Sequence, residues 1–306
     1  MTAQHYTSVA ETDIGEGAPA ADGSAPSTSR AGRNLPVAIV VGVVMGGAVV
    51  ATLVWAKYAF LGIVAAGIAL GTLEMGRRLR SGGYVIPMIP LLVGGQFTLW
   101  LTWPFGTGGA LAGFGGTVVV CMIWRLISPK GRRAVRGPKA PPANYLRDVS
   151  TTVMVAAWVP LFGSFAALLI YHHDGPAKVF ALAVGVVSSD VGGYAAGVLF
   201  GKHPMVPAIS PNKSWEGFAG SLLLGISATA VTVIYLVGKP WYVGLLLGLA
   251  VVLTATLGDL VESQVKRDLG IKDMGSLLPG HGGVMDRFDG FLPSAVVGWI
   301  VLTLVP

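Results

Sequence analysis

Long apolar runs separated by short polar segments make up most of the chain. Windows of about 19 residues, enough for one helix to cross the hydrocarbon core of a bilayer, identify nine such runs. The runs span residues 36–56, 58–76, 83–102, 108–127, 150–171, 177–200, 217–238, 241–262 and 284–304. The pattern therefore predicts an all-α, polytopic integral membrane protein with about nine transmembrane helices.

Composition supports this class. Of the 306 residues, 53% are hydrophobic and 12% are charged, and the mean hydropathy is +0.68, as in membrane proteins rather than soluble domains. The single cysteine, Cys121, lies within an apolar run, which excludes an internal disulfide. Residues 1–34 are rich in Ala, Gly, Ser, Thr and Pro and are expected to form a disordered tail. Residues 35–306 then form the transmembrane domain.

Lysine and arginine residues are distributed unevenly between the two predicted sides of the membrane. Of the 21, all except Lys57, Lys178 and Lys239 fall in the tail and in alternate loops, which share one side. The positive-inside rule makes that side cytoplasmic, including the tail and the loops near residues 200–217 and 263–290. We therefore expect a multi-pass protein of the cell (plasma) membrane. The net charge of +6 is attributed to anionic headgroups, because no nucleic-acid-binding motif accompanies the basic loops.

Acidic residues inside the apolar runs are the first candidates for chemistry. Asp190, Asp259 and Glu262 occupy such positions, where an ionised group is costly unless it faces a polar cavity, a counter-ion or a metal. The i, i+3 spacing places Asp259 and Glu262 on one helical face, and Asp286 and Asp289 share a face if the last helix begins there. Two such faces would supply hard oxygen ligands for Mg²⁺ beside substrate phosphates. The number of carboxylates also allows a second cation.

Basic residues and a glycine turn lie close to these acids in the sequence. The basic side chains of the segment are Lys266, Arg267, Lys272 and Arg287. Because they are so close, the acids can alternatively be explained as ion-pair partners at a helix end. In "LPGHGG" (278–283), Gly282 and Gly283 let backbone N–H groups approach an anion closely. We interpret His281 as a turn residue or phosphate hydrogen-bond donor rather than as a general base.

A second polar segment, residues 200–217, lies on the same predicted side of the membrane. Its side chains that suit phosphate binding are Lys202, Ser210, Asn212 and Lys213. The stretch "SPNKSWEG" also predicts a helix start, with Ser214 as the N-cap and Glu216 favourable to the helix dipole. That helix start does not account for Lys213.

The stretch "SQVKRDLGIKDMGSLLPGHGGVMDRFD" resembles the signature of the phosphatidate cytidylyltransferases, the CDP-diacylglycerol synthases. Its matching positions are Ser263, Lys266, Arg267, Lys272, Asp273, His281, Gly282, Gly283, Asp286, Arg287 and Asp289. Residues 200–217 resemble a second segment of this family, and the resemblance extends over about residues 35–306. One difference follows Asp190, where this chain continues Val-Gly-Gly-Tyr and family members more often carry Thr and then Ala-Tyr or Ala-Phe.

This resemblance implies that the chain joins CTP to phosphatidic acid within the membrane, giving CDP-diacylglycerol and pyrophosphate. It implies that Mg²⁺ is held by Asp259, Glu262, Asp286 and Asp289. The residues implied in catalysis are Asp259, Asp286, Lys266, Arg267 and Arg287. Those implied in binding the phosphates of CTP and lipid are Lys202, Ser210, Asn212, Lys213, Lys272, His281, Gly282 and Gly283. Membrane lipids and a second copy of the chain, as a homodimer, are the expected partners.

Two other interpretations of the same residues stay open. A lipid or polyprenol kinase, or a nucleotidyltransferase on a related scaffold, would use the same polar segments with a different acceptor. A cation-coupled membrane transporter would place Asp190, Asp259 and Glu262 along a pathway through the bilayer. The transporter accounts for the acids but not for the two polar segments on one side of the membrane.

Overall fold

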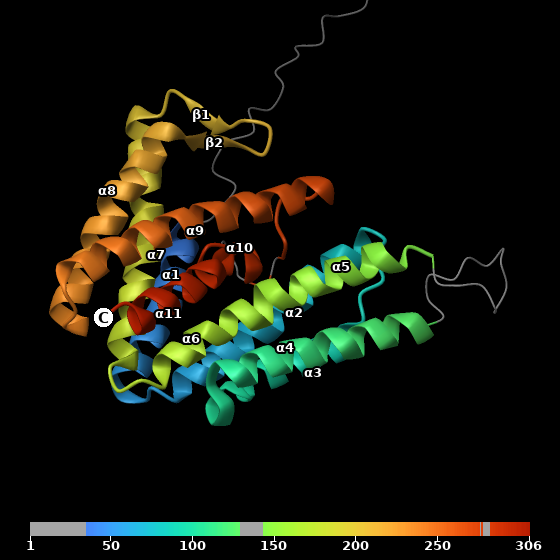
Figure 1. Cartoon of the computed structure of the whole chain (residues 1–306). Helices are drawn as coiled ribbons and strands as arrows, with labels where there is room; N and C mark the ends of the chain where they lie inside the picture. Colours follow the sequence, from blue (N-terminus) through green and yellow to red (C-terminus); the bar gives the residue numbers. More distant parts are fainter. Residues whose placement is uncertain (1–34, 129–142, 276, 278–281) are drawn as a thin grey trace, which may run out of the picture. The chain divides into compact units, whose positions relative to one another are not determined.

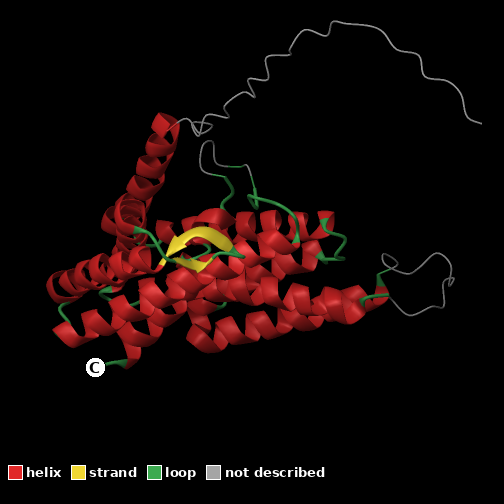
Figure 2. Ribbon diagram, turned by 90° about the horizontal axis from the view of Figure 1, so that it is seen from above, coloured by secondary structure: helices red, strands yellow, loops and turns green. Residues whose placement is uncertain are grey.

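The computed structural model describes residues 35–128, 143–275, 277 and 282–306. The predicted disordered tail, most of the basic loop after residue 128 and His281 lie outside the described residues. The described chain is almost entirely helical, and its strands form a two-stranded sheet (Figures 1 and 2). The all-α prediction is therefore confirmed.

The helices follow one another with short connections. They are α1 (Leu35–Trp55), α2 (Ala59–Ser81), α3 (Met88–Trp100), α4 (Thr102–Ile127), α5 (Tyr145–Ala156), the π-helix η2 (Ala157–Leu161), α6 (Phe162–Ile170), α7 (Gly175–Phe200), α8 (Trp215–Thr232), the π-helix η3 (Val233–Val237), α9 (Trp241–Asp268), α10 (Met285–Phe288) and α11 (Phe291–Leu304). The strands β1 (Pro204–Val206) and β2 (Ser210–Ser214) form an antiparallel hairpin between α7 and α8.

Seven helical segments of the described chain are long and apolar enough to cross a membrane, so the protein is a multi-pass membrane protein. Two shorter apolar helices, Gly42–Trp55 and Met88–Trp100, accompany them. The predicted count of nine spanning helices is therefore not confirmed. The run 83–102 is short as a helix because Pro87 disfavours helical backbone in the residue before it, and α3 begins only at Met88.

Helix α9 is longer than predicted. It continues to Asp268, so the first six residues of the segment 263–290 are helical rather than part of a loop. Two i, i+4 pairs stabilise these extra turns: Lys266 with Glu262, and Gln264 with Asp268. Basic and acidic side chains predicted to lie on a loop therefore project from a rigid helix.

Tight packing of α7 against α8 and of α9 against α11 brings the polar segments together. Glycines allow the close approach, as is usual between membrane helices. A Cβ atom at Gly192 of α7 would lie 2.5 Å from the carbonyl oxygen of Gly220 on α8. On α9, a Cβ at Gly258 would lie 2.9 Å from the ring of Pro293. Larger side chains at these positions would separate the helices that carry the candidate site.

Candidate active site

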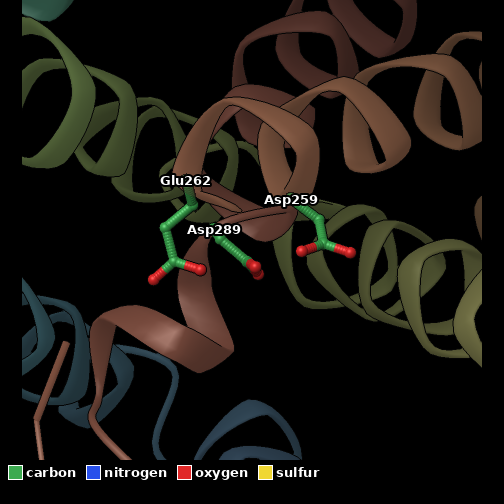
Figure 3. A group of neighbouring side chains, drawn as sticks. All are labelled: Asp259, Glu262 and Asp289. Carbon is green, nitrogen blue, oxygen red and sulfur yellow. The ribbon is translucent and has the colours of Figure 1, made fainter. Parts of the chain in front are cut away.

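Three carboxylates meet where α9 passes the junction between α10 and α11. Asp259 and Glu262 lie one turn apart on α9, and Asp289 follows α10. One oxygen from each carboxylate lies within 4.8 Å of the other two. Figure 3 shows the Asp289 carboxylate between those of its two neighbours. The structure thus brings together three of the four acids predicted as metal ligands.

Glu262 has the most unusual surroundings of the three. Its side chain is fully buried, and Lys266 Nζ donates to its Oε2 at 2.5 Å. Its Oε1 is buried without a hydrogen-bond partner within the described chain. A buried charged oxygen left without a partner is costly, so Oε1 fits a ligand atom for a cation. The hard oxygen donors of this group suit Mg²⁺.

Asp286, the fourth predicted metal ligand, lies outside this group of three. Its carboxylate accepts hydrogen bonds from the backbone N–H groups of Met274 and Gly283 and from Lys266 Nζ, the last at 3.0 Å. Lys266 therefore links Asp286 to Glu262. In the structure Asp286 orders the connection between α9 and α10, and its role as a ligand stays a prediction.

The hairpin carries a second lysine to the carboxylates. Lys213 lies near the end of β2, and its Nζ is 2.5 Å from Asp259 Oδ2. The predicted N-cap is confirmed, because Ser214 Oγ accepts a hydrogen bond from Gly217 N at 3.1 Å. Glu216 accepts from the backbone N–H groups of residues 202 and 203, both at 3.2 Å, and so fastens the base of the hairpin to α8. These contacts hold Lys213 at the site.

A polar cavity of about 330 Å³ opens beside Asp259. It lies between α7, the hairpin, α8 and α9. Its polar lining includes Ser189, Asp190, Ser210, Asn212, Lys213, Thr256 and Asp259. Ser210 and Asn212, predicted to bind phosphate, therefore line the wall of the same cavity as Asp259.

A second, apolar cavity of about 630 Å³ is lined in part by Arg287 and Phe288, the two residues before Asp289. Residues of α1, α2, α6, α7, α10 and α11 line it, among them Val49, Phe180 and Phe288. Arg287 is the one charged residue among its described lining residues. The carboxylate group therefore borders the polar cavity through Asp259, and the residues just before Asp289 line the apolar cavity.

Other predicted site residues lie farther from the carboxylates. The Nε atom of Arg267 donates to the carbonyl of Ile209 in the hairpin turn at 3.2 Å. Lys202 and Lys272 have exposed side chains. Gly282 has a positive φ of 88°, which suits the predicted glycine turn.

Glu74 on α2 lies beside Gly283 and Met285 but is not one of the predicted site residues. Its buried Oε2 accepts a hydrogen bond from Met285 N at 3.0 Å, 211 residues away, and its Oε1 has no partner in the described chain. On the same helix, Arg78 Nε donates to Met274 O at 2.7 Å. The sequence contains a signal for Glu74, because it is an ionisable residue within the apolar run 58–76.

The fold is that of a multi-pass membrane protein. The chain belongs to the cytidylyltransferase family, a class of nucleotidyltransferases, whose model matches residues 36–305. A Mycobacterium leprae (strain TN) protein named "Phosphatidate cytidylyltransferase" is 62% identical over 97% of this chain and 100% of its own length. A protein of the same name from Mycobacterium tuberculosis (strain ATCC 25618 / H37Rv) is 61% identical over 98% of this chain and 94% of its own. A protein of the same name from Staphylococcus haemolyticus (strain JCSC1435) is 38% identical over 47% of this chain and 55% of its own length.

Proposed function

We propose that this chain transfers the cytidylyl group of CTP to phosphatidic acid, forming CDP-diacylglycerol and pyrophosphate. The observation that carries the proposal is the group of Asp259, Glu262 and Asp289, which borders a polar cavity through Asp259 and follows directly on residues that line an apolar cavity, Arg287 and Phe288. A nucleotide suits the polar side and lipid tails suit the apolar side. The names of the mycobacterial relatives support the same pair of substrates.

Mg²⁺ is the cofactor proposed for the three carboxylates. When bound, it supplies positive charge to the triphosphate of CTP, as in other phosphoryl and nucleotidyl transfers. The unpartnered Oε1 of Glu262 supports this assignment, since ion pairing with Lys266 leaves that atom without a role. Asp286 is proposed to orient Lys266 and the connection between α9 and α10.

Lys213 and Lys266 bring positive charge to the place where two polyanionic substrates meet. Unit charges about 4 Å apart repel by roughly 4 kcal/mol at an effective dielectric constant near 20. Each lysine contacts an acid of the group, Lys213 through Asp259 and Lys266 through Glu262. We propose that both ammonium groups also pair with substrate phosphates and stabilise the transition state.

The bond changes require no protein base. A phosphate monoester has a second pKa near 6, so the phosphatidate oxygen is largely ionised at neutral pH. That oxygen attacks the α-phosphorus of CTP and forms a new P–O bond. The bond from the α-phosphorus to the oxygen bridging the β-phosphate breaks, and pyrophosphate leaves with the electron pair. The residues of the chain position the phosphates and compensate their charge.

The apolar cavity is proposed to receive the acyl chains of phosphatidic acid. Arg287, the charged residue of its described lining, lies two positions before Asp289. This arrangement would place a lipid phosphate near Arg287 and the three carboxylates, with its tails in apolar surroundings.

The hairpin and the carboxylate group are proposed to face the cytoplasm, where CTP is available. Lys239, one of the three lysines on the opposite predicted side, donates through Nζ to the carbonyl of Val305. The connection between η3 and α9 therefore lies at the same end as the C-terminus. Cysteines introduced at 202 and 239 test this orientation, because a membrane-impermeant maleimide added to intact cells should label only position 239.

The function is tested with the chain purified in detergent. Pyrophosphate release is measured with CTP, phosphatidic acid and Mg²⁺, omitting each in turn, and the lipid product is identified by mass. Release should require all three components and yield CDP-diacylglycerol. Asp289→Asn should lose most turnover, while Asp268→Asn, an exposed acid on the same side that contacts Gln264, should retain it.

Failure with phosphatidic acid but turnover with another lipid acceptor would reject the proposed acceptor and favour another lipid nucleotidyltransferase. Transfer of a phosphoryl group instead of a cytidylyl group would identify a kinase. Full activity in Asp289→Asn would reject the three carboxylates as the metal site.

A further inference from the structure

We propose that the polar cavity between α7, the hairpin, α8 and α9 holds the nucleoside half of CTP, and that Asp190 recognises the amino group of its cytosine. This inference rests on the proposed function and deepens it. It assigns nucleotide specificity to residues that lie beside, and not within, the group of three carboxylates.

Position supports the cavity as the nucleoside site. Asp259 belongs both to the carboxylate group and to the cavity lining, and Lys213 lines the cavity while contacting Asp259. A triphosphate bound at the carboxylates therefore has its nucleoside within reach of the cavity. The apolar cavity is unsuitable, because a base and ribose would lose hydrogen bonds to water there without gaining partners.

The wall of the cavity supports the same assignment. Asp190 on α7 and Asp259 on α9 line the same cavity, and the hairpin residues Asn212 and Lys213 complete its wall. A nucleotide whose phosphates bind at Asp259 can therefore reach Asp190 within one cavity.

The lining has the hydrogen-bonding groups that cytidine needs. Cytosine offers an amino donor at N4, and ribose offers hydroxyl groups. Asp190 is exposed, lines the cavity and has no hydrogen-bond or ion-pair partner within the described chain. Asn212, also exposed, and Thr256 can donate and accept. The aromatic rings of Tyr194 and Phe218 add apolar surface for a base.

The carboxylate of Asp190 gives the cavity a means of choosing cytosine over uracil. An ionised carboxylate only accepts hydrogen bonds, and it therefore pairs with the N4 amino group of cytosine. Uracil carries an oxygen acceptor at that position, which would face the carboxylate without a proton between them. One such base contact provides about 1–3 kcal/mol of discrimination, a factor of roughly 5 to 150 in kcat/KM.

The test compares CTP, UTP and N4,N4-dimethyl-CTP as substrates of the unmodified protein and of Asp190→Asn, with Asp268→Asn as the matched control. In the unmodified protein, dimethylation should lower kcat/KM at least about 10-fold, because the amino donor is lost. In Asp190→Asn, whose amide both donates and accepts, the CTP to UTP ratio should fall at least about 10-fold. The Mg²⁺ concentration giving half-maximal rate should stay unchanged.

Equal turnover of CTP and its dimethyl derivative by the unmodified protein would overturn the proposal, and this measurement needs no variant to fold. A loss in Asp190→Asn that is equal for CTP and UTP and is relieved by more Mg²⁺ would also overturn it, by assigning Asp190 to the metal. No turnover of CTP by the unmodified protein under any condition would instead contradict the proposed function itself.

Discussion

Gly283 approaches the buried carboxylate of Glu74 so closely that a Cβ atom on it would lie 2.6 Å from Glu74 Oε2. The same atom would lie 2.9 Å from Asp286 Oδ2 and 2.7 Å from the backbone nitrogen of Gly275. Real Cβ atoms do not approach this closely, so one of these groups would have to move. The turn before α10 thus depends on a glycine whose neighbours come from α2 and from the two ends of the turn.

Gly283→Ala is therefore expected to displace Asp286 or Glu74 and to lower CTP turnover at least about 10-fold, as misplacement of a site by about 1 Å can do. Gly116→Ala is the control, because a Cβ at that exposed position on α4 meets nothing within 4 Å. The measurements are pyrophosphate release and the thermal midpoint in detergent. Full activity in Gly283→Ala would show that the turn tolerates the displacement.

Glu74 itself is expected to stabilise the site through its acceptor oxygen. Glu74→Ala leaves the buried N–H of Met285 without its partner, which costs about 1–3 kcal/mol. The thermal midpoint and CTP turnover should both fall. Glu74→Gln keeps an oxygen in the same place and should recover much of both. Equal losses in the two variants would assign the effect to the charge of Glu74 rather than to the hydrogen bond.

Local patterns predicted the membrane class and the identity of the polar segments, because both depend on the type and spacing of neighbouring residues. The cap at Ser214 and the shared face of Asp259 and Glu262 are properties of a few consecutive residues, and the structure has both. Hydropathy predicts an end of α9 at residue 262, six residues before the observed end, because it marks where apolar residues stop and not where the helix stops. Ion pairing between Glu262 and Lys266 supports the added turns.

Long-range contacts account for what the sequence did not predict. The sequence predicts Asp286 as a metal ligand, but its observed partners are Lys266, Met274 and Gly283. Glu74 is an acid inside the apolar run 58–76, but its position alone does not indicate its partner. Its contact spans 211 residues, and no local spacing contains that information. The two cavities likewise arise only when α1, α2, α7 and α9 pack in three dimensions.

Lys213 is predicted to act mainly on the nucleotide. Its ammonium group is 2.5 Å from Asp259 and lines the polar cavity, so Lys213→Met removes positive charge from the proposed triphosphate position. Hydrogen bonds to charged groups contribute about 1.5–3 kcal/mol, so kcat/KM for CTP should fall roughly 10- to 150-fold. Arg77→Met is the control, because that exposed basic side chain on α2 lies outside the cavity lining and is not a predicted site residue. An equal loss in both variants would indicate a general effect of positive charge.

Arg125 and Asp148 form a buried ion pair that joins the end of α4 to the first turn of α5. Arg125 Nη2 is 2.7 Å from Asp148 Oδ2, and each side chain is 1% exposed. Removing one partner of a buried pair costs about 3–5 kcal/mol, because the other charge is left uncompensated, whereas replacing both by apolar residues is often neutral. Arg125→Met should therefore lower the thermal midpoint strongly. The double variant Arg125→Met with Asp148→Leu should lower it much less, even though it removes more of the native contacts.

A thermal midpoint in the double variant as low as, or lower than, that of Arg125→Met would contradict this prediction. It would mean that other contacts of Arg125, such as the hydrogen bond of its Nη2 to the Ala143 carbonyl at 2.8 Å, outweigh the pair.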